Sequence, residues 1–161
     1  MAQIGQFSTL FSYHFDTTER LMDQAEKLPE DQYRDDLGIK WGSVHELLLH
    51  ILATDNGYRV ALNTGQRPAP LEAENFPDLD ALRRLLEEER EGMEVYLGGL
   101  SAGMIEEVVE LRAGPDRTIA LPRWRFLNHL LFHGMQHQAD AAARLTRFGH
   151  SPGDLDFIFY R

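Results

Sequence analysis

The chain of 161 residues contains no cysteine. Disulfide bonds, thiolate metal sites and a cysteine nucleophile are therefore excluded, and a cytoplasmic location is the default expectation. No apolar run reaches the roughly 20 residues that a membrane-spanning helix needs. The first residues also lack the basic stretch and apolar core of a secretory signal. We therefore expect neither export nor a membrane partner.

Basic residues are scarce as well. The sequence has 16 Lys and Arg against 26 Asp and Glu, which gives a formal net charge of −10. Proteins that bind the nucleic-acid backbone usually carry a basic patch, and the nearest approach to one here is four arginines spread over residues 112–125. We expect no nucleic-acid partner, and the acidic excess favours an ordinary soluble surface.

The length suits one domain with one hydrophobic core, spanning residues 1–161. Four segments repeat apolar residues at alternating steps of three and four, which is the pattern of one helix face. They cover about residues 4–28, 43–63, 78–98 and 122–148. The second opens with Ser43-Val44-His45-Glu46, which fits the Ser-x-x-Glu capping box. In the third, we expect the charged run from Arg83 to Glu91 to be a solvated face.

Between the third and fourth helices the pattern changes. Residues 106–112 and 117–121 flank a turn-forming Ala-Gly-Pro-Asp stretch, which predicts a short β-hairpin. Helices that each carry one apolar stripe bury those stripes against one another. The predicted fold is therefore an all-α four-helix bundle with a short hairpin before the last helix. Its long connections, at 28–43 and 63–78, leave room for crossovers.

The fourth helix holds an unusual concentration of histidine. His129, His133 and His137 form two i,i+4 pairs. Such a pair places both imidazoles on one helix face, about 6 Å apart along the axis. On a helical projection His133 and His137 point into the apolar sector, whereas His129 lies at its edge.

Two inward imidazoles need partners, because burying an unpaired polar group costs about 1–3 kcal/mol. A shared metal ion satisfies both rings, and hydrogen bonds to neighbours such as Asp55 or Asp140 are the alternative. His50 is the best third ligand from another helix, whereas we expect His45 to face water. His14 falls in the inward stripe of the first helix, where it can be a fourth ligand, a support for the ligands or a substrate contact.

A site of three histidines suits Zn²⁺, Ni²⁺, Fe²⁺ or Mn²⁺, with zinc and nickel favoured by neutral imidazole. Three protein ligands leave a coordination position for water or substrate. An open site indicates chemistry: a lowered pKa of a bound water or thiol, or polarisation of a carbonyl.

Three segments of the chain match one known pattern. Residues 10–21 (LFSYHFDTTERL) are similar to an aromatic opening helix. Residues 43–51 (SVHELLLHI) are similar to a second helix that ends on a metal histidine, and residues 132–138 (FHGMQHQ) to a last helix with two ligands four apart. In this order and spacing, over nearly the whole chain, they resemble the DinB/YfiT-like superfamily, which is unrelated to the DNA polymerase sharing the DinB name.

The resemblance implies a four-helix bundle, commonly a homodimer, in which His50, His133 and His137 bind one divalent metal ion with water completing the site. Relatives with an assigned function include thiol-dependent S-transferases and a thiol-dependent maleylpyruvate isomerase. They use low-molecular-weight thiols such as bacillithiol or mycothiol. One departure is that the family often has Arg-Gly after the last histidine, where this chain has Gln138-Ala139.

The first functional expectation is a metal-dependent enzyme that transfers such a thiol to small electrophiles, with the metal binding the thiol as thiolate. His14 and Asp140 are candidates for proton transfer or for supporting the ligands. Asp140 can equally form an exposed pair with Arg144. Arg144, Arg125 and Arg59 are candidates to anchor an anionic thiol.

Two alternatives stay open. Metal-assisted hydrolysis would use metal-bound hydroxide and the same three ligands, but the His-Glu-x-x-His pattern is missing because Gly134 follows His133. A non-catalytic metal-binding protein of the stress response, acting through its dimer or another partner, is the third hypothesis. The lack of an evident general base keeps it in consideration.

Overall fold

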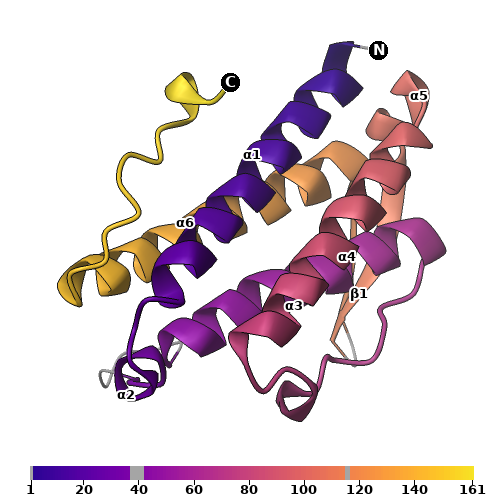
Figure 1. Cartoon of the computed structure of the whole chain (residues 1–161). Coiled ribbons are helices and arrows are strands. Elements are labelled where there is room, and N and C mark those ends of the chain that lie inside the picture. Colours follow the sequence, from indigo (N-terminus) through magenta and orange to yellow (C-terminus); the bar gives the residue numbers. More distant parts are fainter. Residues whose placement is uncertain (1, 37–41, 115–116) are drawn as a thin grey trace.

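A computed structural model describes residues 2–36, 42–114 and 117–161 of the chain. Four long helices form its body (Figure 1): α1 (Ala2–Ala25), α3 (Val44–Thr64), α4 (Leu79–Gly98) and α6 (Arg123–Arg147). The short elements are α2 (Glu30–Tyr33), η1 (Ala73–Asn75), α5 (Ala102–Glu106), the strands β1 (Val108–Gly114) and β2 (Arg117–Pro122), and η2 (Phe157–Phe159). The predicted helical fold with an antiparallel hairpin before the last helix is confirmed. Part of the predicted hairpin turn, residues 115–116, lies outside the described residues.

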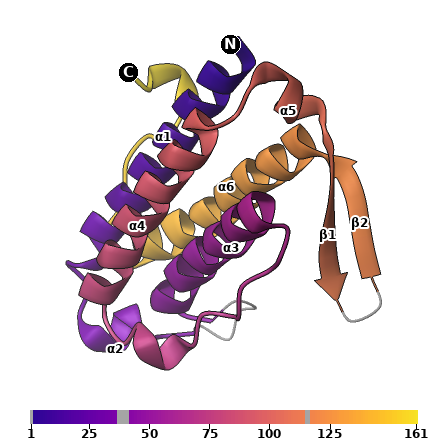
Figure 2. The same ribbon diagram turned by 90° about the vertical axis from the view of Figure 1, so that its right-hand side faces the viewer.

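The four long helices form a ring in which each packs against two others. Both α1 and α3 pack against α4 and α6. Figures 1 and 2 show α1 and α6 running in one direction and α3 and α4 in the opposite one. Because α3 and α4 are parallel neighbours, the chain must return along the bundle between them, through residues 65–78. The long connection expected at 63–78 is therefore required by the topology, whereas the one at 28–43 joins antiparallel helices.

Helix ends lie where local chemistry satisfies the free backbone groups. Ser43 Oγ accepts a hydrogen bond from the Glu46 amide at 3.2 Å, and the Glu46 carboxylate accepts one from the Ser43 amide at 2.6 Å. The predicted capping box is thus present at the start of α3. Gly65 and Gly149 follow α3 and α6 with φ angles of 78° and 86°. This left-handed conformation ends a helix and is strained for residues with a Cβ.

The hydrophobic core fills the space between the four helices, as the apolar stripes predict. The largest fully buried side chains are Phe11, Phe15, Leu21, Met22, Leu47, Leu48, Ile51, Leu52, Leu82, Leu86, Met93 and Leu97. Each contributes on the order of 1.5–3 kcal/mol through its removal from water. In the described part of the chain, no helix has the length and apolar character to span a membrane.

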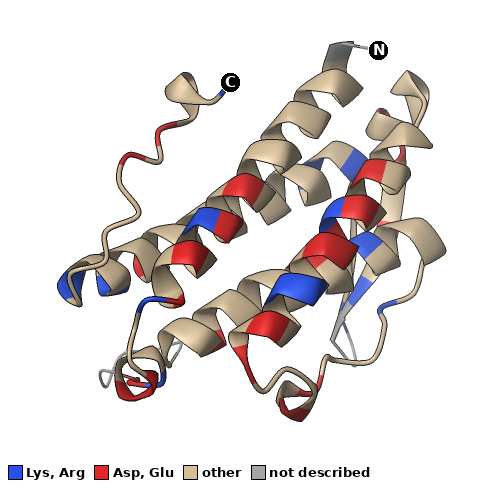
Figure 3. Cartoon of the chain, viewed as in Figure 1, with Lys and Arg blue, Asp and Glu red and all other residues tan. Residues whose placement is uncertain are grey.

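The charged run on α4 is a solvated face with one exception. Figure 3 shows acidic and basic residues alternating along α4 opposite those of α1, where Arg90 pairs with Asp16 and Glu19. Glu89, however, is buried, so the expectation of a fully solvated run is wrong at this residue. Arg59 of α3 forms two hydrogen bonds with its carboxylate, at 2.7 and 2.8 Å. Such a two-point pair compensates the carboxylate for lost hydration.

Candidate metal centre

Three histidines converge where α3 packs against α6. The ligand nitrogens of His50, from α3, and of His133 and His137, from α6, all lie within 4.8 Å of one another. His50 Nε2 is 3.1 Å from His133 Nε2. Two nitrogens bound to one zinc ion at about 2.1 Å, at angles between a right angle and the tetrahedral angle, are about 3.0–3.4 Å apart. The spacing therefore suits a shared ion, and it equally suits an N–H···N hydrogen bond between neutral rings.

The three rings differ in exposure. His137 is buried at 2% exposure, whereas His50 and His133 are half-buried. The centroid of the His137 ring lies 4.7 Å from that of the His50 ring and 4.4 Å from that of the His133 ring. The cluster is thus closed by the bundle core on the side of His137 and reaches toward the surface on the side of the other two rings.

The environment keeps two of the three imidazoles, those of His50 and His133, neutral. Burial, reinforced by the neighbouring histidines, lowers the pKa of His133 to about 4. Burial, followed by the nearby His137, also lowers the pKa of His50. Protonation would place like charges next to one another in a partly dry site. At neutral pH the rings of His133 and His50 therefore offer lone pairs, which is the state that a metal ion requires.

Side chains beside the cluster extend it along the surface. His129 is exposed, and its ring lies 5.9 Å from that of His133, outside the cluster. Tyr58 of α3 meets His129 edge-on at 5.3 Å. The Arg67 guanidinium lies 4.6 Å above the Tyr58 ring. The sequence did not predict these positions of Tyr58 and Arg67. Tyr58 fits the apolar stripe of its helix, and no sequence pattern indicates which side chain an arginine in a loop will contact.

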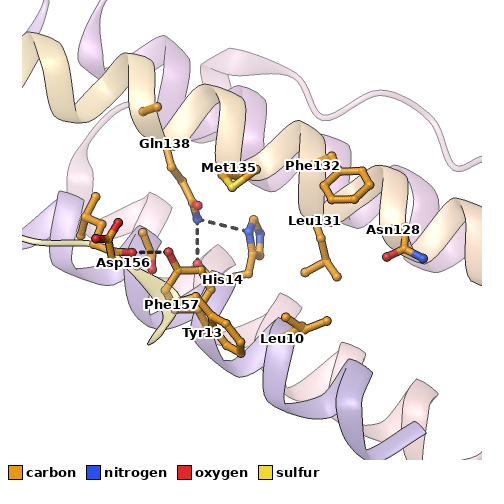
Figure 4. Close-up of a pocket in the computed structure, with 13 residues that line it drawn as sticks. Leu10, Tyr13, His14, Asn128, Leu131, Phe132, Met135, Gln138, Asp156 and Phe157 are labelled. Atoms are coloured by element: carbon orange, nitrogen blue, oxygen red, sulfur yellow. Dashed lines mark hydrogen bonds between the residues drawn. The ribbon is translucent and has the colours of Figure 1, made fainter. Parts of the chain in front are cut away.

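His14 lies in a buried hydrogen-bonded chain rather than among the cluster's ligands. Its Nε2 is 2.8 Å from Asp55 Oδ2, and both side chains are 2% exposed. Gln138 Nε2 donates to the His14 carbonyl oxygen at 2.8 Å and to Thr18 Oγ1 at 2.9 Å, and it lies 3.2 Å from His14 Nδ1 (Figure 4). The carbonyl oxygen requires the amide nitrogen, not its oxygen, at this position.

The chain of donors fixes the state of His14. The Asp55 carboxylate accepts from His14 Nε2 at 2.8 Å, so the ring proton of a neutral His14 is on Nε2, and Nδ1 faces the Gln138 amide nitrogen. Burial raises the pKa of the Asp55 carboxyl, and the adjacent His14 opposes that shift. Both ring nitrogens of His14 are engaged. Of the roles considered for His14, the geometry favours support for the helix that carries the ligands. Its hydrogen bonds connect α1 to Asp55 of α3 and to Gln138 of α6.

Gly134 allows His14 of α1 to pack closely against α6. It lies on α6 between His133 and His137, and a Cβ added there would be 2.2 Å from His14 Cε1 and 2.6 Å from Nδ1. Such distances are far below a van der Waals contact. The absence of a side chain at residue 134 therefore allows α1 to pack directly against the turn of α6 that carries both histidines.

The remaining predicted residues occupy different surroundings. Asp140 is about half exposed, and its Oδ2 is 3.7 Å from His137 Nδ1. Arg144 is buried at 5% exposure, so the expected exposed pair with Asp140 is wrong in that respect. Arg125 is exposed on the first turn of α6, one turn before His129. Arg59 binds Glu89 between α3 and α4, away from the described cluster.

His45 corrects another expectation. It does not face water but is buried at 4% exposure, and its Nδ1 is 2.8 Å from the Tyr33 hydroxyl. The short helix α2 brings Tyr33 over the first turn of α3, with the two rings edge-on at 5.3 Å. Burial lowers the pKa of His45. A short helix in a long connection gives little periodic signal, which is why the sequence does not predict this contact.

Comparison with known proteins places these features in a family. A family model described as the DinB family matches residues 1–161. Among solved structures, the chain is similar to a DinB-like protein, YjoA, from Bacillus subtilis, with 20% sequence identity and a TM-score of 0.65. The match covers 91% of this chain and 93% of that one. At this identity the likeness concerns the fold alone. No curated protein matches the chain.

Proposed function

Because this chain belongs to the DinB family, we propose that it binds one divalent metal ion through His50, His133 and His137 and transfers a low-molecular-weight thiol to small electrophiles. One observation carries the metal site: imidazoles from two different helices converge with their ligand nitrogens within 4.8 Å of one another. The thiol chemistry rests on the resemblance to thiol-dependent transferases, and the character of the site is compatible with it.

The donor set fits a metal of intermediate softness. Three neutral imidazoles suit zinc or nickel best, and they also accept iron or manganese. A divalent ion held there would lower the pKa of a coordinated thiol, so that the thiolate nucleophile is present at neutral pH. Three protein ligands leave room for that thiol on the side where His50 and His133 reach the surface.

The residues around the cluster have separate roles in this proposal. Asp140, whose Oδ2 lies 3.7 Å from His137 Nδ1, is the carboxylate placed to support that ring. The exposed Arg125 stays a candidate to bind the carboxylates of the thiol, and Arg67, which lies over Tyr58, takes the place of Arg59 and Arg144. The latter two arginines are an unsuitable choice, because one is paired with Glu89 and the other is buried.

Metal content of purified variants tests the site. We expect about one equivalent of metal per chain in the wild-type protein, and its loss in His50→Ala, His133→Ala and His137→Ala. His129→Ala is the matched control, because His129 lies on the same helix, i,i+4 from His133, and outside the cluster. Stoichiometric metal in His50→Ala would show that the third ligand is wrong.

Turnover of the metal-loaded protein tests the chemistry. We expect conjugates of monochlorobimane or fosfomycin with at least one member of a thiol panel, and no conjugate with His133→Ala. Ester or amide hydrolysis that is indifferent to thiols but disappears in His133→Ala would favour the hydrolase instead. Metal binding without either activity would favour a non-catalytic role. The homodimer and the cytoplasmic location stay predictions, and light scattering of the purified protein tests the first.

A further inference from the structure

A second cavity lies apart from the histidine cluster. It has a volume of about 440 Å³ and is formed by α1, α6 and the C-terminal tail (Figure 4). Its apolar wall consists of Leu10, Leu131, Phe132, Met135, Leu155 and Phe157. The described residues that line it do not include His50, His133 or His137. The cavity and the cluster thus use different faces of the same part of α6.

The tail is a fixed wall of this cavity. The Tyr13 hydroxyl donates a hydrogen bond to the Leu155 carbonyl oxygen, and Arg20 Nη2 donates one to the Pro152 carbonyl oxygen at 2.7 Å. The ring of Phe157 meets that of Tyr13 edge-on, with centroids 5.1 Å apart. These contacts hold the chain after α6 against α1. The cavity is therefore bounded on three sides, unlike an open groove between two helices.

The floor of the cavity is formed by polar side chains whose hydrogen-bonding groups already have partners within the protein. His14 and Gln138 face the cavity, and their hydrogen bonds are made with each other, with Thr18 and with Asp55. Nothing on the floor therefore demands a charged ligand. Because His14 and Gln138 are only 2% and 3% exposed, the apolar wall provides most of the surface that a ligand would contact.

The mouth combines apolar exposure with negative charge. Phe132, Met135 and Phe157 are 63%, 55% and 45% exposed. An occupant would remove part of this apolar surface from water, which is a favourable change. Asp156 places a carboxylate at the edge, and the chain as a whole has a net charge of −10. An anion is therefore disfavoured, which separates this cavity from any site for an anionic thiol.

From these features we infer that the cavity is a second small-molecule site, which binds a neutral, largely apolar compound with two or three aromatic rings. Its volume falls in the range of about 300–1,000 Å³ that is usual for small-molecule pockets. Asn128 at the rim donates its amide to the Trp124 carbonyl oxygen at 3.0 Å. Its own amide oxygen then provides one acceptor, which suits a ligand with a single hydroxyl or amine.

Fluorescence of 1-N-phenylnaphthylamine, a neutral apolar probe that brightens away from water, tests the inference. We expect saturable binding with a Kd below about 100 μM, a range typical of modest apolar ligands. Ala139→Trp fills the cavity from an exposed position on α6 and should raise the Kd at least about tenfold. Phe157→Ala removes part of the wall and should raise it about threefold or more.

The matched control is Ala73→Trp, which adds the same ring at an exposed residue of η1 that does not line the cavity. It should leave the Kd within about twofold of the wild-type value. Equal binding to the wild type and to Ala139→Trp would overturn the inference, as would no saturable binding to the wild type. Loss of binding when a chelator removes the metal would also overturn it, because the two sites would then be one.

A crystal of the wild-type protein soaked with 1-bromonaphthalene keeps the test independent of how the variants fold. Anomalous density for bromine between α1, α6 and the tail would support the inference. Density only elsewhere, or a second copy of the chain filling the cavity with its own side chains, would overturn it.

Discussion

Substitution of Gly134 by alanine tests whether close packing of α1 holds the two histidines of α6 in place. At an ordinary position inside a helix, Gly→Ala stabilises by up to about 1 kcal/mol, because alanine loses less backbone entropy. At Gly134 the new Cβ would be 2.2 Å from His14 Cε1. His14 has little room to give, because Asp55 and Gln138 hold its ring nitrogens.

Overpacking of this kind costs about 1–3 kcal/mol. Displacing His14 also weakens buried hydrogen bonds worth about 1 kcal/mol each. These costs exceed the helix-propensity gain, so we expect Gly134→Ala to lower the free energy of unfolding by about 1–3 kcal/mol. Gly57→Ala, in the middle of α3, is the matched control, because a Cβ there meets nothing within 4 Å. It should be neutral or stabilising by up to about 1 kcal/mol.

Urea denaturation followed by circular dichroism measures both changes. A double-mutant cycle then isolates the contact, because in a His14→Ala background the clash is absent and Gly134→Ala should cost little. The reasoning would be refuted if Gly134→Ala were as stable as Gly57→Ala, or if its cost were the same with and without the His14 ring.

Two further predictions concern the buried polar groups. Glu89→Ala leaves Arg59 without its carboxylate between α3 and α4 and should lower the free energy of unfolding by about 3 kcal/mol. The exposed Glu88→Ala should change it by no more than about 0.5 kcal/mol, and equal losses would contradict the role given to the pair. In the metal-free protein the pKa of His133 is lowered to about 4, against 6.5 in the unfolded chain. When the pH falls, His133 is therefore protonated in the unfolded chain at a higher pH than in the folded protein. Stability should be fully present above about pH 6.5 and decline toward pH 4, with a shallower decline in His133→Ala; an unchanged slope would count against this assignment.

Most of the helices and their ends could be predicted because their causes are local. The Ser43–Glu46 capping box, Gly65 and Gly149 act within a few residues of where they stand. The hairpin before the last helix follows from two short strand-forming runs around a turn. Glu89 shows the limit of such reasoning: its neighbours in the charged run are solvated, and its burial is explained only by Arg59 and Asn56, which donate to its carboxylate from α3.

The candidate site, too, was predictable where the cause is local and unpredictable where it depends on tertiary contacts. Helical periodicity alone places His133 and His137 on one inward face and leaves His129 at the edge, as the structure confirms. His50 was expected as their partner from its helix position and from the family resemblance, and it does lie with them. The burial of His45 under Tyr33, and the chain from Asp55 through His14 to Gln138, were not predicted in this form.

The sequence by itself thus determined which segments are helical, which faces are buried and which pair of imidazoles shares a face, because these depend on the period of one helix. Only the tertiary structure decided that a third ring from α3 comes within reach of that pair, and that His14 supports α6. These outcomes depend on how far each helix slides and turns against its neighbours. That is set by the packing of the whole core and by a missing side chain at Gly134, rather than by any short stretch of sequence.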